Sequence, residues 1–126
     1  MLAKEYLYQG KKLEELQEMS LNELSEILPA AQRRKLKRGL TDNEKKLLKK
    51  LEKKNDIKTH ERQMIILPQM VGKTLRVHCG KSFEMVVIQE EMMGHALGEF
   101  VLTRKRTAHN APGVGATKSS SSVSVR

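Results

Sequence analysis

The sequence is poor in aromatic residues and in cysteine. Only 3% of its 126 residues are aromatic, tryptophan is absent, and Cys79 is the one cysteine. A single thiol can form neither an intramolecular disulfide nor a cysteine-based zinc site, and it fits a reducing compartment. The scarcity of aromatic rings also argues against a protein that reads single-stranded RNA by stacking its bases.

Long apolar segments are missing as well. No run of about 18 apolar residues exists, so we expect no membrane-spanning helix. Residues 1–10 contain no apolar stretch typical of a secretory signal, which indicates a protein of the cytoplasm. With no expected membrane span and no secretory signal, the sequence indicates a cytoplasmic protein, and its partners must be inferred from its charge.

Positive charge is abundant and unevenly placed. The formal net charge is +9, and the four successive segments 1–31, 32–54, 55–103 and 104–126 carry −3, +8, −1 and +5. Two basic segments therefore flank a nearly neutral one. This distribution predicts a polyanionic partner, and nucleic acid is the first candidate because its phosphates form a continuous array of negative charge.

Helical periodicity dominates the first half of the chain. Apolar residues recur at helical spacing, and two capping boxes, Ser20 to Glu23 and Thr41 to Glu44, mark helix starts. Gly39 is a natural residue to end a helix. The pattern predicts helices over 13–19, 21–28, 30–38 and 42–54.

The second half changes to short β patterns. We predict strands over 64–67, 74–79 and 82–88, a turn at Gly80-Lys81, and a short helix over 90–100. We expect Phe83, Met85, Met92, Met93 and Phe100 to fill the core. The tail has too few large apolar groups to fold alone, and we expect it to be disordered until it binds.

These elements predict an α+β fold. Helices come first, then a small mixed β-sheet with a short helix, and finally an extended basic C-terminal tail. The expected organisation is a helical basic N-terminal extension, a connector, an α+β core and the tail, with bounds 1–54, 55–63, 64–103 and 104–126.

Short sequence motifs that follow one another in a fixed order indicate a protein family. They include Gln32-Arg33-Arg34, Lys58-Thr59-His60, Met64-Ile65-Ile66-Leu67-Pro68, Met93-Gly94-His95 and Leu97-Gly98-Glu99-Phe100. Residues Ala111 to Thr117 form a further motif. In this order and spacing the chain resembles the small-ribosomal-subunit protein S-nineteen family in its archaeal and eukaryotic branch, and Leu102 to Arg106 is closer to the archaeal form.

The resemblance implies a structural role without catalysis. Family members bind ribosomal RNA in the head of the small subunit, beside a protein of the S-thirteen family, close to contacts with the large subunit. Their basic tail reaches toward the tRNA-binding sites. For this chain the resemblance therefore implies ribosomal RNA as partner, with contacts to tRNA and to the large subunit also expected.

Basic residues are the candidates for RNA contact. On the helix predicted over 30–38, positions i and i+4 share a face, so Arg34 aligns with Arg38 and Arg33 with Lys37; like charges this close favour an anion between them. The full set of expected RNA-binding residues is Arg33, Arg34, Lys35, Lys37, Arg38, Lys58, His60, Arg62, Lys73, Lys81, His95, Arg104, Lys105, Arg106, His109 and Lys118.

Other classes of function are less well supported. Residues 30–54 are spaced like a helix-turn-helix, so a DNA-binding regulator is the alternative. The histidines His60, His78, His95 and His109 lack metal-ligand spacing, and no catalytic constellation is present. Gly113 to Lys118 departs from the phosphate-loop pattern. We therefore expect no enzyme, no metal and no cofactor.

Overall fold

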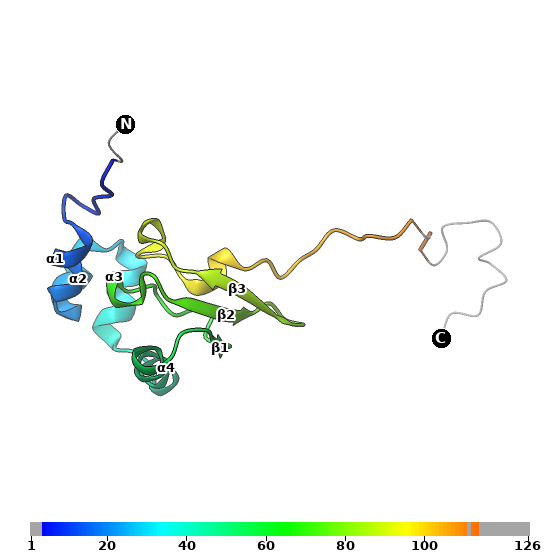
Figure 1. The fold of residues 1–126 in the computed structure, drawn as a ribbon, viewed down its shortest axis with the longest axis horizontal. Coiled ribbons are helices and arrows are strands. Elements are labelled where there is room, and N and C mark those ends of the chain that lie inside the picture. The colour runs from blue at the N-terminus through cyan, green and yellow to red at the C-terminus, as the bar shows by residue number, and fades with distance from the viewer. Residues whose placement is uncertain (1–3, 111, 114–126) are drawn as a thin grey trace.

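The N-terminal part of the chain folds into short helices that lie together on one side of the molecule (Figure 1). The computed structural model describes residues 4–110 and 112–113. Within them the α-helices are α1 (Leu13–Glu18), α2 (Leu21–Ile27), α3 (Ala30–Arg38) and α4 (Asp42–Lys53). All of the helices predicted over 13–54 are thus confirmed to within one residue at either end.

Local signals set these helix ends. The Ser20 hydroxyl accepts a hydrogen bond from the Glu23 N–H, and the Glu23 carboxylate accepts one from the Ser20 N–H at 2.8 Å. Thr41 and Glu44 make the same reciprocal pair at the start of α4. Such pairs satisfy N–H groups that a helix start leaves without partners. Gly39 ends α3 with a φ of +89°, a conformation that favours glycine.

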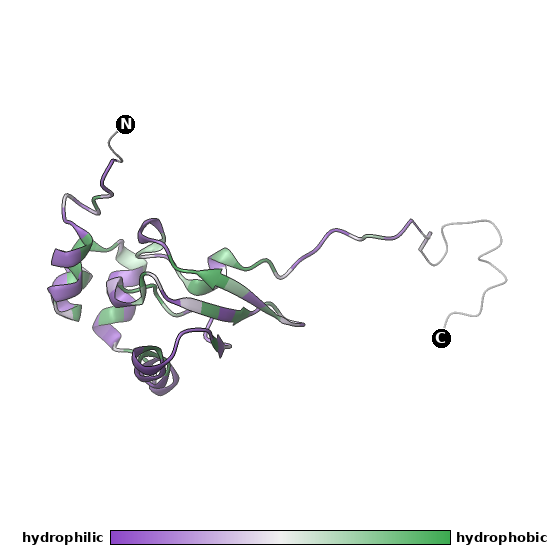
Figure 2. Ribbon diagram, viewed as in Figure 1, coloured by the Kyte–Doolittle hydropathy of each residue, from purple (hydrophilic) through white to green (hydrophobic). Residues whose placement is uncertain are grey.

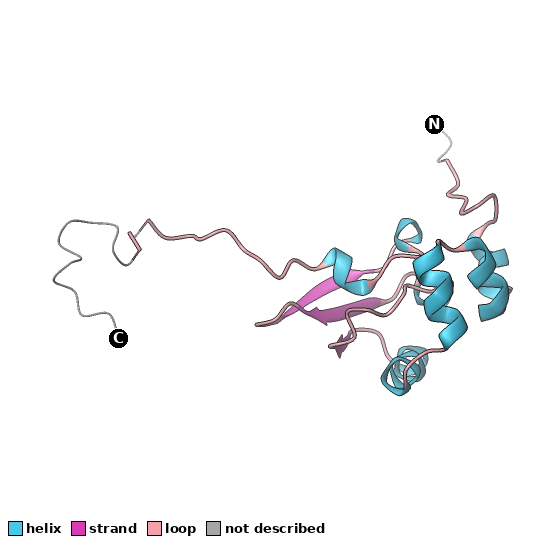
Figure 3. Ribbon diagram, turned by 180° about the vertical axis from the view of Figure 1, so that it is seen from behind, coloured by secondary structure: helices cyan, strands magenta, loops and turns pink. Residues whose placement is uncertain are grey.

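A mixed sheet follows the helices. Its strands β1 (Ile57–Thr59), β2 (Thr74–His78) and β3 (Phe83–Val87) lie in that order, with β1 parallel and β3 antiparallel to the central β2. The hairpin of β2 and β3 projects away from the helices, as the views from both sides show (Figures 1 and 3). The predicted α+β class with a small mixed sheet is confirmed.

The predicted strand over 64–67 is wrong. This apolar segment is a fully buried connection, and the strand that pairs with β2 is Ile57–Thr59, inside the segment predicted as a polar connector. The backbone of 64–67 pairs instead with the loop 94–97, through a bridge between Ile65 and Ala96. A short apolar run indicates burial without specifying its partner, and here the 3₁₀ helix η1 (Pro68–Met70) ends it at once.

The predicted helix over 90–100 is also wrong. Two 3₁₀ helices, η2 (Glu90–Met92) and η3 (Leu97–Phe100), occupy its ends. Gly94 lies between them with a φ of +79°, which interrupts any continuous right-handed helix. The intervening backbone then serves the buried segment, since the Ile66 N–H donates to the His95 carbonyl and the Leu97 N–H to the Met64 carbonyl.

One hydrophobic core joins the helices to the sheet. Leu36 of α3 and Leu47 and Leu51 of α4 share a cluster with the inward side chains of β2, Leu75 and Val77. Figure 2 shows hydrophobic colour along the strands and hydrophilic colour over much of α4, whose lysines face outward. The helices are therefore an integral support for the sheet.

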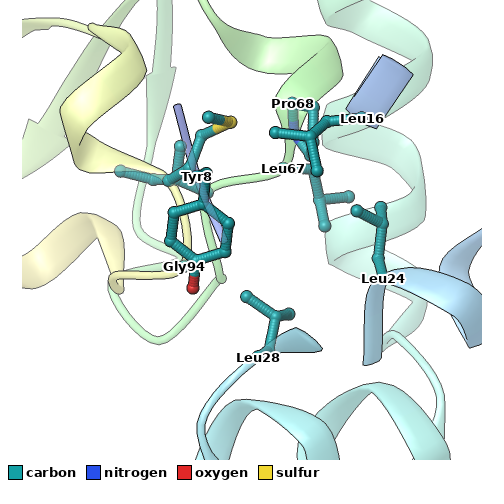
Figure 4. A pocket seen from close by; sticks show the side chains of 9 residues that line it. Tyr8, Leu16, Leu24, Leu28, Leu67, Pro68 and Gly94 are labelled. Atoms are coloured by element: carbon teal, nitrogen blue, oxygen red, sulfur yellow. The ribbon is translucent and has the colours of Figure 1, made fainter. Parts of the chain in front are cut away.

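A second, smaller cluster anchors the N-terminus. Leu16, Leu24 and Met93 form it, and the half-buried ring of Tyr8 packs against it (Figure 4). The Tyr8 hydroxyl lies so close to Gly94 that a Cβ at that position would be 3.0 Å away. Burial raises the pKa of Tyr8 above its ordinary value. This contact fixes the first residues described against the loop after η2.

The face of the sheet turned away from the core is open. Met85 is 67% exposed and Val87 49% exposed, while Val86 between them is buried. The expected core positions of Met85 and Phe100 are therefore wrong, whereas Met93 is buried as predicted. Along a strand only every second residue faces the core. In β3 the inward residue is Val86, followed by Ile88 just after the strand, instead of Phe83, Met85 and Val87.

Candidate nucleic-acid interface

The outer side of α3 presents a shallow groove between basic side chains. Arg33, Arg34, Lys37 and Arg38 line it together with Ala30. Arg34, Lys37 and Arg38 are exposed, and their side chains take part in no ion pair within the described residues. Three unneutralised cations on one helix leave a site for an anion, because their mutual repulsion falls when a phosphate lies between them.

Arg33 is held by the protein itself. Its Nε donates to the Ser25 carbonyl at 3.1 Å, and its Nη2 donates to the carbonyls of Glu26 and Leu28 at 3.3 and 3.2 Å. These carbonyls belong to the end of α2, which leaves them without helical partners. The guanidinium thus caps α2 and ties it to α3.

Lys35 is likewise engaged inside the fold. Its Nζ forms an ion pair of 2.5 Å with the Glu44 carboxylate, which is only 2% exposed, and it also donates to the Gln63 carbonyl. Glu44 at the same time caps α4. Lys35 therefore compensates a buried negative charge and connects α3, α4 and the segment that leads into the core.

Arg62 spans three separate segments. Its Nη1 donates to the His78 carbonyl at 2.6 Å, and its Nη2 donates to the Gly98 and Val101 carbonyls at 2.9 and 3.0 Å. The end of β2, η3 and the residue that directly follows η3 are held together in this way. Of the predicted RNA-binding residues, Arg33, Lys35 and Arg62 have their polar atoms directed at the protein.

A cluster of rings lies where the strands end. The His60 and His78 rings are 4.5 Å apart between centroids, and Phe83 lies 5.1 Å from His60 and 4.9 Å from His78. The Lys58 Nζ lies 5.4 Å from the centre of the Phe83 ring. Lys58 and His60 were expected at the interface, whereas His78 and Phe83 were missed because only the strand register places them beside His60.

The remaining candidates are spread over the surface. Lys81 is exposed in the turn between β2 and β3, and Lys73 is half-buried just before β2. His95 pairs through Nδ1 with the Glu99 carboxylate at 2.8 Å, and its ring lies 6.0 Å from that of Phe100. These groups do not converge on one pocket.

The tail leaves the body on the side of the hairpin, opposite the N-terminal helices (Figures 1 and 3). Arg104, Lys105, Arg106 and His109 are all exposed, and Lys105 pairs with Glu84 of β3 at 3.4 Å. Residues 104–110 contain neither helix nor strand. Lys118, the last of the predicted contacts, lies outside the described residues.

The thiol of Cys79 lies close to the turn between β2 and β3. Cys79 is buried, and the hydrogen bond between its Sγ and the Ser82 Oγ, 3.4 Å apart, lowers the pKa of the thiol. Within residues 4–110 and 112–113, no three histidine, cysteine or acidic side chains gather as a metal site would need. No helix there combines the length and apolar character that crossing a membrane requires.

Comparison with known proteins decides the family. The model of the family described as ribosomal protein S19 matches residues 34–109. The chain belongs to this family. It is 56% identical over 119 residues to the small ribosomal subunit protein uS19 of Thermoplasma volcanium, a match that covers 94% of this chain and 79% of the relative.

Membership in the S19 family confirms the resemblance and its archaeal leaning, since the relative is archaeal. The matched residues run from Arg34 through the sheet to His109, so they include most of the α3 groove, the ring cluster and the first part of the tail. The DNA-binding alternative gains no support. Its two helices do not form an independent unit, because α3 packs against α2 and α4 against β1.

Proposed function

We propose that this ribosomal protein is a structural constituent of the small subunit and binds ribosomal RNA in the subunit head. The observation that carries the proposal is the α3 groove, where the exposed Arg34, Lys37 and Arg38 lack acidic partners within the described residues. Arginine can hold a phosphate with two parallel hydrogen bonds. The protein acts by binding, in the cytoplasm, and needs no catalytic group or cofactor.

The basic residues divide into two sets under this proposal. Arg34, Lys37, Arg38, Lys81 and the exposed cations of the tail neutralise phosphates. Arg33, Lys35 and Arg62 hold the shape that presents them, because their donors already satisfy carbonyls or a buried carboxylate. The two sets differ in how a substitution acts, since only the first changes the salt dependence of binding.

The charges of the tail and of the N-terminal helices suggest which neighbours each contacts in the subunit. The extended basic tail leads away from the N-terminal helices and carries the exposed Arg104, Lys105 and Arg106, which suits a segment that orders on RNA and approaches tRNA. The acidic helices α1 and α2 suit contact with a basic protein neighbour, for which we propose the S-thirteen family member, better than contact with RNA. Contacts with the large subunit belong to the same proposal.

The salt dependence of RNA binding tests the proposal that the α3 groove binds ribosomal RNA. The affinity of the full chain for a transcript of the small-subunit head RNA is measured over a range of salt concentrations. The double variant Arg34→Gln, Arg38→Gln should lower the slope of log K against log salt by about 1 to 2, at unchanged melting temperature. Glu52→Gln on the exposed side of α4 is the matched control for substituting a surface charge.

An unchanged affinity in the double variant would remove the α3 groove from the interface. Co-sedimentation of the tagged chain with small subunits through a high-salt wash provides the cellular counterpart. A chain that stays at the top of the gradient would contradict the structural role altogether.

A further inference from the structure

The open face of the sheet carries a feature that the α3 groove does not explain. His60, His78 and Phe83 come from three different strand ends, yet their ring centroids lie 4.5 to 5.1 Å apart. Strands β1 and β2 are parallel and β3 returns from the hairpin turn, so all three positions fall at the same end of the sheet. Figure 1 shows this end pointing away from the helices.

These rings do not belong to the core. The buried face of β2 and β3 consists of Leu75, Val77 and Val86, and the rings lie on the opposite face. His60 is exposed, and Phe83 and His78 are half-buried beside one another. In a chain with so few aromatic residues, a three-ring group outside the core is not needed for packing.

The neighbouring charges indicate the partner. Lys58 lies over the Phe83 ring at 5.4 Å, and Lys81 is exposed in the adjacent turn. Rings flanked by lysines are typical of single-stranded nucleic-acid binding, where bases stack on the rings and cations hold the phosphates. A protein partner fits less well, because lysine is depleted at the centre of protein interfaces.

One hydrogen bond adds order to the cluster. The Gly80 N–H donates to Nδ1 of His78 at 3.1 Å. An accepting Nδ1 leaves the proton of the neutral imidazole on Nε2. The turn thus holds the middle ring in one orientation, and a preorganised surface loses less entropy when a base stacks on it.

We propose that His60, His78 and Phe83 form a platform on which an unpaired RNA base stacks. The proposal rests on the proposed RNA-binding function and adds a second kind of contact to it. The α3 groove recognises phosphate alone, whereas the platform recognises an exposed base. The scarcity of aromatic residues argues against a protein that reads single-stranded RNA, but two rings of this platform are histidines, which only the strand register brings beside Phe83.

The experiment compares two probes of equal charge. One is a single-stranded oligouridine of about ten nucleotides, and the other is the same ribose-phosphate chain without bases. The full chain should bind the oligouridine at least about fivefold more tightly than the abasic chain, since stacking contributes roughly 1–3 kcal/mol per base. Phe83→Leu, which keeps an apolar side chain without a ring, should lose most of this preference.

Matched variants separate stacking from folding and charge. Phe83→Tyr keeps the ring and should retain the preference, and Val87→Thr alters the same face of β3 without touching a ring. A preference that survives in Phe83→Leu overturns the platform and leaves phosphate binding intact. Equal weakening on both probes would also overturn it. An unsubstituted chain that binds the head RNA and neither probe would overturn the platform alone, whereas failure to bind the head RNA would remove the proposed function as well.

Discussion

Arg62 and Gly98 are bonded to each other in both directions. The Gly98 N–H donates to the Arg62 carbonyl at 2.8 Å, and the Arg62 guanidinium donates back to the Gly98 carbonyl at 2.9 Å. A Cβ on Gly98 would lie 3.0 Å from the Arg62 Cβ and 3.1 Å from its carbonyl oxygen. Gly98 and Arg62 thus form a joint, a reciprocally hydrogen-bonded pair that connects η3 to the segment before the buried residues 64–67.

The joint predicts that Arg62→Lys destabilises the fold. A lysine ammonium cannot reach the three carbonyls that the guanidinium serves, so at least one remains without a donor. Each loss of this kind costs about 1–3 kcal/mol. We expect the melting temperature to fall by at least about 5 °C in a circular dichroism melt.

Arg34→Lys is the control for this variant, because it makes the same exchange on the exposed face of α3. It should melt within about 2 °C of the unsubstituted chain. If both variants melt alike, the carbonyl contacts of Arg62 contribute nothing to stability.

The ion pair between Lys35 and Glu44 leads to a second prediction. The Glu44 carboxylate is buried, so removing its cation leaves a charge without compensation. Lys35→Met should cost about 3 kcal/mol in the free energy of unfolding, measured by urea denaturation. Lys37→Met, two residues along the same helix but exposed, should cost less than about 0.5 kcal/mol. Equal effects would contradict the assignment of Lys35 to the scaffold.

The helices could be predicted from the sequence because their signals are local. Ser20 with Glu23, and Thr41 with Glu44, are each three residues apart, and the structure shows the same pairs bonded. The sheet was harder, because β1 consists of only Ile57–Thr59 and gains its strand character from β2, more than ten residues away. A three-residue strand has too little periodicity to be seen in a sequence.

The sequence identified the basic residues of the candidate site, but it did not show which of them face solvent and which hold the fold together. Arg33 and Arg34 look alike in sequence, yet one caps α2 and the other faces solvent. What separates them is the position of carbonyls on neighbouring segments, which no run of basic residues reveals. For the same reason the ring cluster of His60, His78 and Phe83 emerged only from the strand register.

The capping box of α2 predicts a dependence of stability on pH. The N–H of Ser20 lowers the pKa of the Glu23 carboxyl below its ordinary value. The stability that this bond contributes is therefore complete above the ordinary carboxyl pKa and is lost as the pH falls through the lowered one. Glu23→Gln cannot titrate, so its melting temperature should fall less than that of the unsubstituted chain between neutral and strongly acidic pH.

Glu26→Gln serves as the comparison, since it lies on α2 outside the capping box. A Glu26→Gln chain should lose stability on acidification as the unsubstituted chain does. The prediction fails if Glu23→Gln and Glu26→Gln respond to acid in the same way.

The tail should be separable from the fold. A chain that stops after Thr103 keeps Val101, which is buried and accepts a hydrogen bond from Arg62. Among the side-chain contacts of residues 104–110 and 112–113, it loses only the ion pair of the exposed Lys105 with the half-buried Glu84. Such surface pairs contribute about 1 kcal/mol or less. We therefore expect the truncated chain to melt within a few degrees of the full one, with its circular dichroism spectrum showing an intact fold.

The same truncation should weaken RNA binding, because the segment it removes carries five basic residues and no acidic ones. The salt dependence of the affinity for the head RNA measures this loss. Replacing Arg104, Lys105 and Arg106 by glutamine in the full-length chain separates charge from length: the triple variant should reproduce most of the loss if phosphate contact is the cause. A truncated chain that unfolds would show instead that the tail supports the core, and the separation of binding segment from scaffold would then be wrong.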